Sequence, residues 1–512
     1  MVEIHITTTP GGLNAERARY ALGELLRLGG VAAVWGSRLG YGELADVTIS
    51  PSLESEPRLI ELNRVGEPPG NLPWPRRLYA LFDSADTPAG RPLYVDDGGR
   101  PRVTLAEGGV RCAVDPVATT WYLLGQIEEL TRPERRDAHG RLSRALSRTP
   151  SVFFDGPRLE DWGSFIAAAL AVGGVVARVG RHPDGAAWSV ALTHDIDSLG
   201  ERSLGRALRL IGAGALRFSG ERLRAGRRML GLLRRPDRHH RLEHCIDADA
   251  PDAGGYYVHP GRRGPHDPAY RLSRNRKVLE KLLATGQEVG HHYGYLTAGN
   301  PELLRGEAEE LRRLTGLDCF GGRAHYLRLR CPADLAALEA ADLEYDASLG
   351  FADAPGWRLS TGGPYRPWNH AAERPLGLFE LPLPVMDGAL FRPWGDATVE
   401  VEAAWRSLLP HLEAARDSGA CLSLLWHQRV FGPAHPGWGE VYARALAWAR
   451  ENGARTVAPR ELVDLARSAE GLTVHGERLI HKGDRPLSVI FSTAPDRHLP
   501  LEPGRYLEAP RA

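Results

Sequence analysis

Two carboxylates and an imidazole lie within four positions near the middle of the chain. In the stretch SVALTHDIDSLG, a short apolar run leads directly into His194, Asp195 and Asp197. Residues two apart in a strand-like segment point the same way, so Asp195 and Asp197 can both face one site. Taken alone, the stretch is more typical of a turn at the end of a strand than of a catalytic site. It indicates a catalytic site only if other side chains capable of catalysis lie beside it in the folded chain.

Other polar residues also follow apolar, strand-like runs. They are His292 in QEVGHH, Arg323 and His325 in CFGGRAHY, Asp387 in LFELPLPVMD and His427 in CLSLLWH. Helical patterns such as SRNRKVLEKLLATG lie between the runs, and repeated strand–helix units favour a parallel sheet or a barrel. The C-terminal ends of barrel strands meet at one rim. We therefore expect these side chains to form one site suited to a hydrolytic metal centre.

The region from about 188 to 465 resembles a known family, the polysaccharide deacetylases (NodB-homology group, carbohydrate esterase family 4). LTHDID, EVGHHYGY, GGRAHYLR and LLWH are similar to four family motifs, in the family's order. DPAY, YDASLGFAD, ELPLPVMD and PGW (436–438) resemble a bacterial branch with an extra N-terminal domain. The resemblance implies an α/β fold, a distorted (β/α) barrel of about seven strands related to the TIM barrel, with a smaller N-terminal α/β domain.

The resemblance also implies a role for each matching residue. Asp195 would be the catalytic base, Arg323 would orient it, and His427 would be the general acid. Asp387 is our candidate for the carboxylate that keeps His427 protonated. Candidates to stack on the faces of sugars, with core packing as the alternative, are Tyr293, Tyr326 and Trp426.

The metal ligands implied by the family are incomplete in this chain. Asp197 and His292 stand at two ligand positions, but Leu296 occupies the place of the usual histidine four residues after His292. His325 stands where the family has proline. We predict that His325 supplies the missing ligand, with His291 as the second choice. One carboxylate and two imidazoles hold a divalent metal with open positions, and zinc fits these ligands best.

These residues predict a metal-dependent hydrolase that removes an N-acetyl or other acyl group from an amino sugar or glycan precursor. Two alternatives remain open. The same centre could hydrolyse a small or cyclic amide, as in relatives with the spaced Asp-x-Asp. Because Leu296 replaces a ligand, the chain could instead be a catalytically degenerate glycan-binding protein.

The bulk composition is that of an ordinary globular protein with several domains. The 512 residues are 43% hydrophobic and 25% charged, and their formal net charge is zero, which argues against a general nucleic-acid binder. We expect an N-terminal α/β domain over 1–112 and a connector packed on the barrel over 113–185. The catalytic domain follows over 186–468, and a β-rich extension over 469–512.

The cysteines and the apolar runs predict the compartment. Five scattered cysteines without CxxC spacing suggest a reduced environment and no thiolate metal site. The first residues lack the pattern of a secretory signal, and no run approaches ~20 apolar residues. We therefore expect a cytoplasmic location. The sequence predicts no oligomeric state.

A basic insert at residues 201–241 interrupts the predicted catalytic domain. It carries twelve arginines interleaved with apolar residues. One interpretation is a solvated helical hairpin whose apolar stripe packs on the domain. The other is a basic amphipathic element that rests on an anionic membrane or binds a polyanionic glycan. The second interpretation would place the protein at the periphery of the inner membrane.

Overall fold

The computed structural model describes most of the chain from residue 116 onward. The described ranges are 116–199 and 242–510, with gaps at 150, 174, 262, 265, 269, 319, 393–398 and 433–434. Before residue 116 it describes residues 15–35 and the strand segments β1 and β3 to β9. The basic insert lies outside the described residues, so neither interpretation of it is tested.

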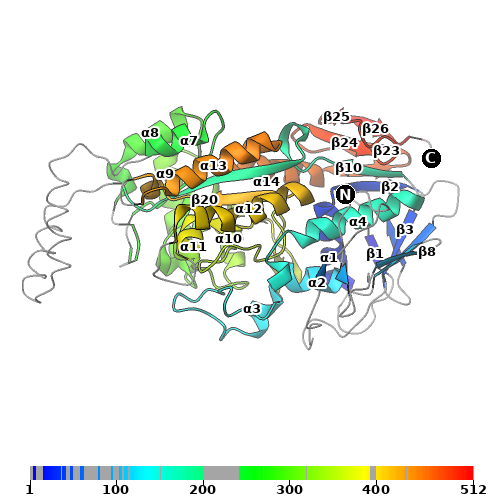
Figure 1. Cartoon of the computed structure of the whole chain (residues 1–512), viewed down its shortest axis with the longest axis horizontal. Coiled ribbons are helices and arrows are strands. Elements are labelled where there is room, and N and C mark those ends of the chain that lie inside the picture. The colour runs from blue at the N-terminus through cyan, green and yellow to red at the C-terminus, as the bar shows by residue number, and fades with distance from the viewer. Residues whose placement is uncertain are drawn as a thin grey trace, which may run out of the picture.

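A curved parallel sheet forms the centre of the larger part of the molecule (Figure 1). Its strands follow the order β18-β15-β14-β13-β12-β11-β20-β19, and β21 pairs with β11 beside this path. The strand bounds are β11 Trp188–Ile196, β12 Gly255–Val258, β13 Glu288–Tyr293, β14 Phe320–Ala324, β15 Leu343–Asp346, β18 Phe379–Glu380, β19 Val385–Met386, β20 Cys421–Leu425 and β21 Ala454–Val457. Residues 381–384 join the two edge strands, so the chain itself bridges the open side. The sheet is a distorted (β/α) barrel, as predicted, with eight strands on the path where about seven were expected.

Strand β11 lies in the middle of the sheet and is buried along all nine residues. Its apolar residues serve two cores, because Val190 and Leu192 pack with one hydrophobic cluster and Ala191 with another. A parallel strand that is covered on both faces has apolar residues at consecutive positions, which explains the apolar run from Val190 to Leu192. After Ser189 near its start, the polar residues of the strand, Thr193, His194 and Asp195, come towards its carboxyl end.

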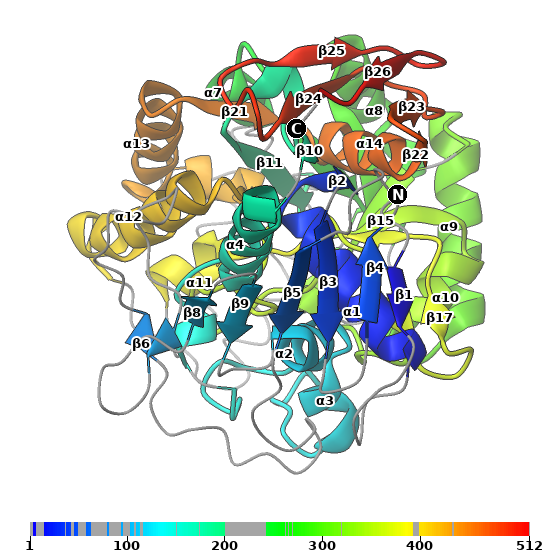
Figure 2. The ribbon, with the colours of Figure 1, turned by 90° about the vertical axis from the view of Figure 1, so that its right-hand side faces the viewer.

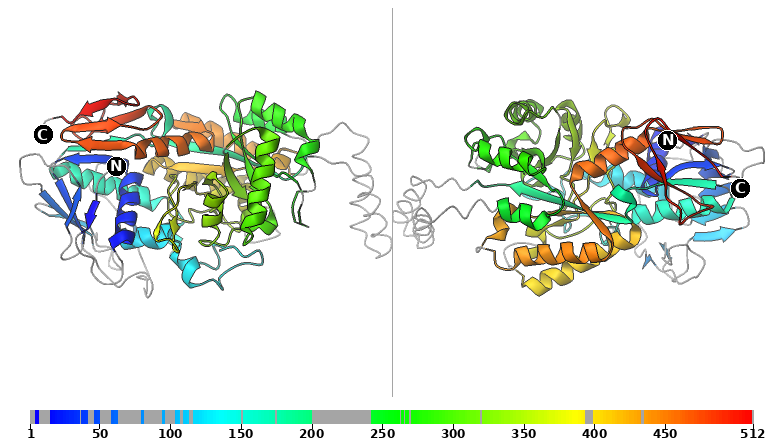
Figure 3. Two further views of the ribbon diagram at one scale, coloured as in Figure 1. Left: turned by 180° about the vertical axis from the view of Figure 1, so that it is seen from behind. Right: turned by 90° about the horizontal axis from the view of Figure 1, so that it is seen from above.

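Helices alternate with these strands and cover the outside of the barrel (Figures 1 and 3). Their bounds are α7 Leu242–Asp249, α8 Arg276–Ala284, α9 Pro301–Thr315, α10 Leu335–Ala340, α11 Asp387–Phe391, α12 Val401–Ser418, α13 Trp438–Glu451 and α14 Pro459–Glu470. The ends of α9 follow from the sequence: the Asn300 side chain accepts the N–H of Leu303 at 3.1 Å, and Gly316 ends the helix at φ 73°. None of the described helices is both long and apolar enough to cross a membrane.

A second sheet combines segments from three distant parts of the chain (Figure 2). Its antiparallel order is β2-β10-β24-β25, with bounds β2 Val31–Trp35, β10 Val175–Val179, β24 Leu487–Phe491 and β25 Leu499–Leu501. Ala33, Ala177, Val489 and Phe491 are buried in one cluster beneath it. The predicted N-terminal domain, connector and C-terminal extension therefore share a hydrophobic core.

Smaller sheets complete the described strands. One has the order β1-β4-β3-β5, another β22-β23-β26, and three pairs are β6-β7, β8-β9 and β16-β17. The bounds are β1 Ile4–Ile6, β3 Ser37–Tyr41, β4 Asp46–Ile49, β5 Arg58–Leu62, β6 Tyr79–Ala80, β7 Tyr94–Val95, β8 Val103–Ala106, β9 Gly109–Cys112, β16 Trp368–Asn369, β17 Arg374–Pro375, β22 Leu472–His475, β23 Arg478–His481 and β26 Tyr506–Glu508.

Connector helix α4 (Arg158–Gly173) contacts β2 and β10 of the second sheet on one side and α12 of the barrel on the other. Helix α1 spans Ala15–Leu28, and the connector contains α2 Pro116–Leu124, α3 Ile127–Thr131 and α4 Arg158–Gly173. Glu160 of α4 is fully buried and accepts hydrogen bonds from the Thr361 hydroxyl (2.8 Å) and the Gly362 N–H (3.0 Å). Glu129 of α3 forms a buried ion pair with Arg358. The segment after α3 then runs alongside the barrel (Figures 1 and 3).

Candidate metal centre

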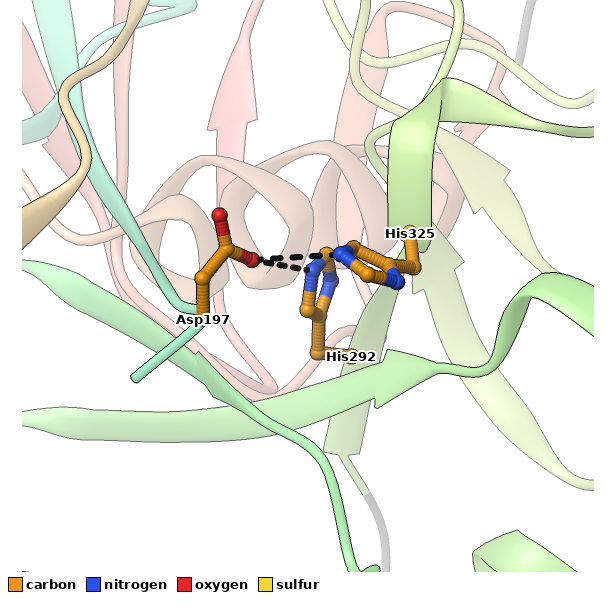
Figure 4. Close-up of side chains that lie close together, drawn as sticks. All are labelled: Asp197, His292 and His325. Atoms are coloured by element: carbon orange, nitrogen blue, oxygen red, sulfur yellow. Dashed lines mark ion pairs between the residues drawn. The ribbon is translucent and has the colours of Figure 1, made fainter. Parts of the chain in front are cut away.

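Asp197, His292 and His325 converge at the carboxyl ends of three strands (Figure 4). Asp197 follows β11, His292 lies in β13, and His325 follows β14. The Oδ1 atom of Asp197 lies 3.4 Å from Nε2 of His292 and 3.4 Å from Nε2 of His325. One donor atom from each residue lies within 4.8 Å of the others. The structure thus brings together the three ligands predicted from the sequence.

The donor atoms of this group are those that a cation would satisfy. Oδ1 of Asp197 and Nε2 of His292 are buried without a hydrogen-bond partner, which is costly for polar atoms. Nδ1 of His292 donates to the carbonyl of Arg323 at 3.1 Å, so in the neutral ring the lone pair is on Nε2, the atom that faces Asp197. One carboxylate and two imidazoles in this state fit a divalent metal of the zinc type.

His291, the second choice for the third ligand, lies on the other face of β13. It is fully buried, and its Nε2 lies 3.5 Å from Oε2 of Glu307. Neighbouring strand residues point to opposite faces, so His291 and His292 cannot both face the same site. Leu296, at the position of the family's histidine, is 43% exposed. Position 325, and neither 291 nor 296, contributes to the group.

Asp195 lies beside the three residues and is held by a buried guanidinium. Nη1 of Arg323 donates to Oδ1 of Asp195 at 3.1 Å and lies 2.9 Å from the Thr193 hydroxyl, while its Nε donates to the carbonyl of Ala347 at 2.8 Å. Oδ2 of Asp195 lies 3.9 Å from Nε2 of His292. Since Arg323 is fully buried and anchored at several atoms, it fixes the orientation of this carboxylate.

His427 faces the other oxygen of Asp197 and is paired with Asp387. Its Nδ1 donates to Oδ1 of Asp387 at 2.9 Å, and its backbone N–H donates to Oδ2 at 2.8 Å. Nε2 of His427 faces Oδ2 of Asp197 at 3.6 Å. Burial by itself would lower the pKa of His427, but the carboxylates of Asp387 and Asp197 outweigh burial and raise it. The protonated imidazole is therefore favoured, as a general acid requires.

Arg429 is a site residue that sequence reasoning missed. Its Nη1 lies 3.4 Å from Oδ2 of Asp197, and its side chain is 54% exposed. Burial would raise the pKa of Asp197, but His427, the two imidazoles of the centre and Arg429 hold it well below the usual value. The only sequence clue was a basic residue two positions after His427.

The three aromatic candidates for sugar binding differ in exposure. Tyr293 is 1% exposed and its hydroxyl donates to Asp346. Trp426 is 0% exposed, and its Nε1 donates to the carbonyl of Trp438 at 3.0 Å. Neither ring offers a face to a substrate, so the prediction is wrong for these two, whose rings complete the core. Tyr326, in contrast, is 41% exposed.

Comparisons with known proteins give a similarity of fold only. No protein-family model matches the chain, and no curated protein does. Solved structures that resemble it include a protein from Mycobacterium smegmatis described as a polysaccharide deacetylase (20% identity, 56% of this chain and 93% of the other, TM-score 0.36). Another is Puue allantoinase (13% identity, 56% and 92%, TM-score 0.39). A third, from Pseudomonas aeruginosa PAO1, is also described as a polysaccharide deacetylase (16% identity, 56% and 93%, TM-score 0.38).

Proposed function

We propose that this chain is a metal-dependent hydrolase of the polysaccharide deacetylase family. It removes an N-acetyl or similar acyl group from an amino sugar or a glycan precursor. The observation that carries the proposal is the meeting of three groups at one rim: the Asp197, His292 and His325 cluster, the Asp195–Arg323 pair and the Asp387–His427 pair. A cation site flanked by a base and an acid is the arrangement that amide hydrolysis needs.

The protein residues divide the proton transfers between them. A divalent cation such as Zn²⁺, held by Asp197, His292 and His325, lowers the pKa of water and polarises a carbonyl when it is bound. Asp195, oriented by Arg323, accepts the proton of the water that adds to the acyl carbon. His427 donates a proton to the amide nitrogen, the C–N bond breaks, and acetate and the free amine leave.

Measuring the metal content of the protein tests the proposed metal site. We expect the purified protein to carry about one equivalent of a divalent metal, and His292→Ala and His325→Ala to lose most of it. His291→Ala is the matched control, since it removes a buried histidine of the same strand that faces away from the group. A full equivalent of metal in His325→Ala would overturn the assignment of the third ligand.

Measuring the release of acetate tests the proposed deacylation. Asp195→Asn should keep the metal and lower kcat on an N-acetylated amino sugar by about 10²–10⁴-fold, because the substituted amide cannot accept a proton. If wild-type protein instead opens cyclic amides and leaves N-acetyl sugars intact, the small-amide alternative is correct. If it holds no metal and binds glycans without hydrolysing them, it is a degenerate binding protein.

A further inference from the structure

Four aromatic rings gather beside the candidate metal centre. They belong to His139, His266, Tyr295 and Tyr326, which come from four separate segments of the chain. The Tyr326 ring centroid lies 5.0 Å from that of His139, 5.5 Å from Tyr295 and 5.8 Å from His266. It also lies 4.8 Å from the ring of His325, a proposed metal ligand. The ring cluster is thus continuous with the centre.

His139 comes from the connector and is bound firmly to the barrel. The Asp137 carboxylate accepts the backbone N–H of His139 at 2.9 Å and that of Arg141 at 3.0 Å, which closes a turn. Arg141 donates to the carbonyl of Tyr326 at 2.6 Å. Arg328 of the barrel donates to the carbonyl of His139 at 3.2 Å. Hydrogen bonds in both directions therefore hold the His139 ring next to Tyr326.

One side of the ring cluster faces solvent. Tyr326 and His266 are exposed, whereas His139 and Tyr295 are half-buried. The Arg328 guanidinium lies 4.3 Å from the centroid of the Tyr295 ring and covers it. The hydroxyl of Tyr295 lies 3.0 Å from Nδ1 of His139. Tyr295 therefore supports the other rings from behind.

The backbone at Tyr326 is in an unfavourable conformation. Tyr326 has φ 63° and Leu327 has φ 52°, so two consecutive non-glycine residues occupy the left-handed region. Such conformations cost energy and concentrate at functional sites, where the surroundings impose them. Here the Arg141 hydrogen bond to the Tyr326 carbonyl helps to impose one, and it presents the tyrosine ring to solvent.

We infer that His139, His266 and Tyr326 form a saccharide subsite, which binds the pyranose ring whose acylated amine is cleaved at the metal centre. A pyranose has flat C–H faces and hydroxyl groups at its edge. Tyrosine and histidine rings match it with an apolar face and polar edge atoms. The inference rests on the proposed deacylation of an amino sugar. It gives the connector a direct part in substrate recognition.

Direct binding tests the subsite without requiring turnover. Calorimetric titration with a tetramer of N-acetylglucosamine should show that His139→Ala and Tyr326→Asn bind at least tenfold more weakly than wild type. Asparagine is chosen at 326 because it tolerates a left-handed φ. Tyr326→Phe keeps the ring and should retain most of the affinity, which separates stacking from misfolding. His475→Ala, at an exposed histidine of β22, is the matched control.

Kinetics then separates failure of the subsite from failure of the function. In His139→Ala the ratio of kcat/KM for N-acetylglucosamine to kcat/KM for N-methylacetamide should fall at least tenfold. If N-acetyl sugars are hydrolysed and both this ratio and tetramer binding are unchanged in His139→Ala, the function stands and the subsite is wrong. If no N-acetyl sugar is hydrolysed but tetramer binding depends on His139, the subsite stands and the proposed function is wrong.

Discussion

At the scale of single residues, the centre depends on how Asp197 uses its two oxygens. Oδ1 faces the imidazoles of His292 and His325, while Oδ2 faces His427 and Arg429. One carboxylate therefore links the proposed metal position to the proposed acid. Removing a group that interacts with one oxygen should alter the negative charge on the other oxygen, because the two oxygens share one charge.

The Asp387–His427 pair predicts the pH dependence of activity. Asp387→Asn removes a carboxylate that raises the pKa of His427, so that pKa should fall. Activity requires protonated His427 and is lost as pH rises through its pKa. The descending limb of the pH–kcat profile should therefore move to lower pH. Asp184→Asn, which changes an exposed carboxylate, should leave the profile in place. An unmoved limb in Asp387→Asn would exclude His427 as the acid.

At the scale of elements, a buried polar network joins β11 to its neighbours. Asp249 of α7 accepts hydrogen bonds from Tyr256 of β12 (2.8 Å) and Tyr442 of α13 (2.6 Å), and from Nε2 of His194 (3.1 Å). Nδ1 of His194 donates to the carbonyl of Trp426 at 2.6 Å, directly before His427. Since both ring nitrogens donate, His194 is protonated, and the network holds the strands that carry the base and the acid.

Breaking this network should destabilise the barrel. Asp249→Asn leaves the buried charge of His194 unpaired, and we expect a loss of about 3–5 kcal/mol in the free energy of unfolding. Burial lowers the pKa of His194, but Asp249 raises it well above the usual value. The stabilisation is thus complete below about pH 6.5, the unfolded value, and is lost as pH rises through the folded pKa.

Urea denaturation at several pH values checks this prediction. The difference between wild type and Asp249→Asn should be large at pH 6 and should shrink in alkaline solution. Asp247→Asn, in the same helix but with its side chain outside the network, is the control. Equal urea midpoints for wild type and Asp249→Asn at pH 6 would show that the pair contributes nothing.

At the scale of the whole molecule, the sheet β2-β10-β24-β25 joins the two ends of the described chain (Figure 2). Its middle strands are β10 of the connector and β24 of the C-terminal extension, and β2 lies at one edge. Ala177 of β10 pairs with Phe491 of β24 across more than 300 positions of sequence, and β10 also pairs with β2, so the connector is joined to both terminal parts of the chain. His139, whose ring packs against Tyr326 beside the candidate metal centre, belongs to the same connector.

The hydrophobic core beneath this sheet gives a stability prediction far from the candidate site. Phe491 of β24 is 3% exposed in the shared core, and Phe491→Ala should cost about 3–5 kcal/mol of unfolding free energy. The urea midpoint measures the effect, with the exposed Lys482→Ala as the control. A midpoint for Phe491→Ala equal to that of Lys482→Ala would mean that the sheet does not support the fold.

The sequence by itself determined the barrel and predicted most residues of the candidate site, because parallel strands deliver their carboxyl ends to one edge. Asp195, Asp197, His292, His325 and His427 are recognisable since each follows a local apolar run. Tertiary structure decided what long-range packing controls: which of two adjacent histidines faces the candidate metal centre, which aromatic rings remain exposed, and that Arg429 contacts Asp197 and His139 packs against Tyr326. Local patterns carry backbone periodicity, whereas exposure and proximity arise only when distant segments pack together.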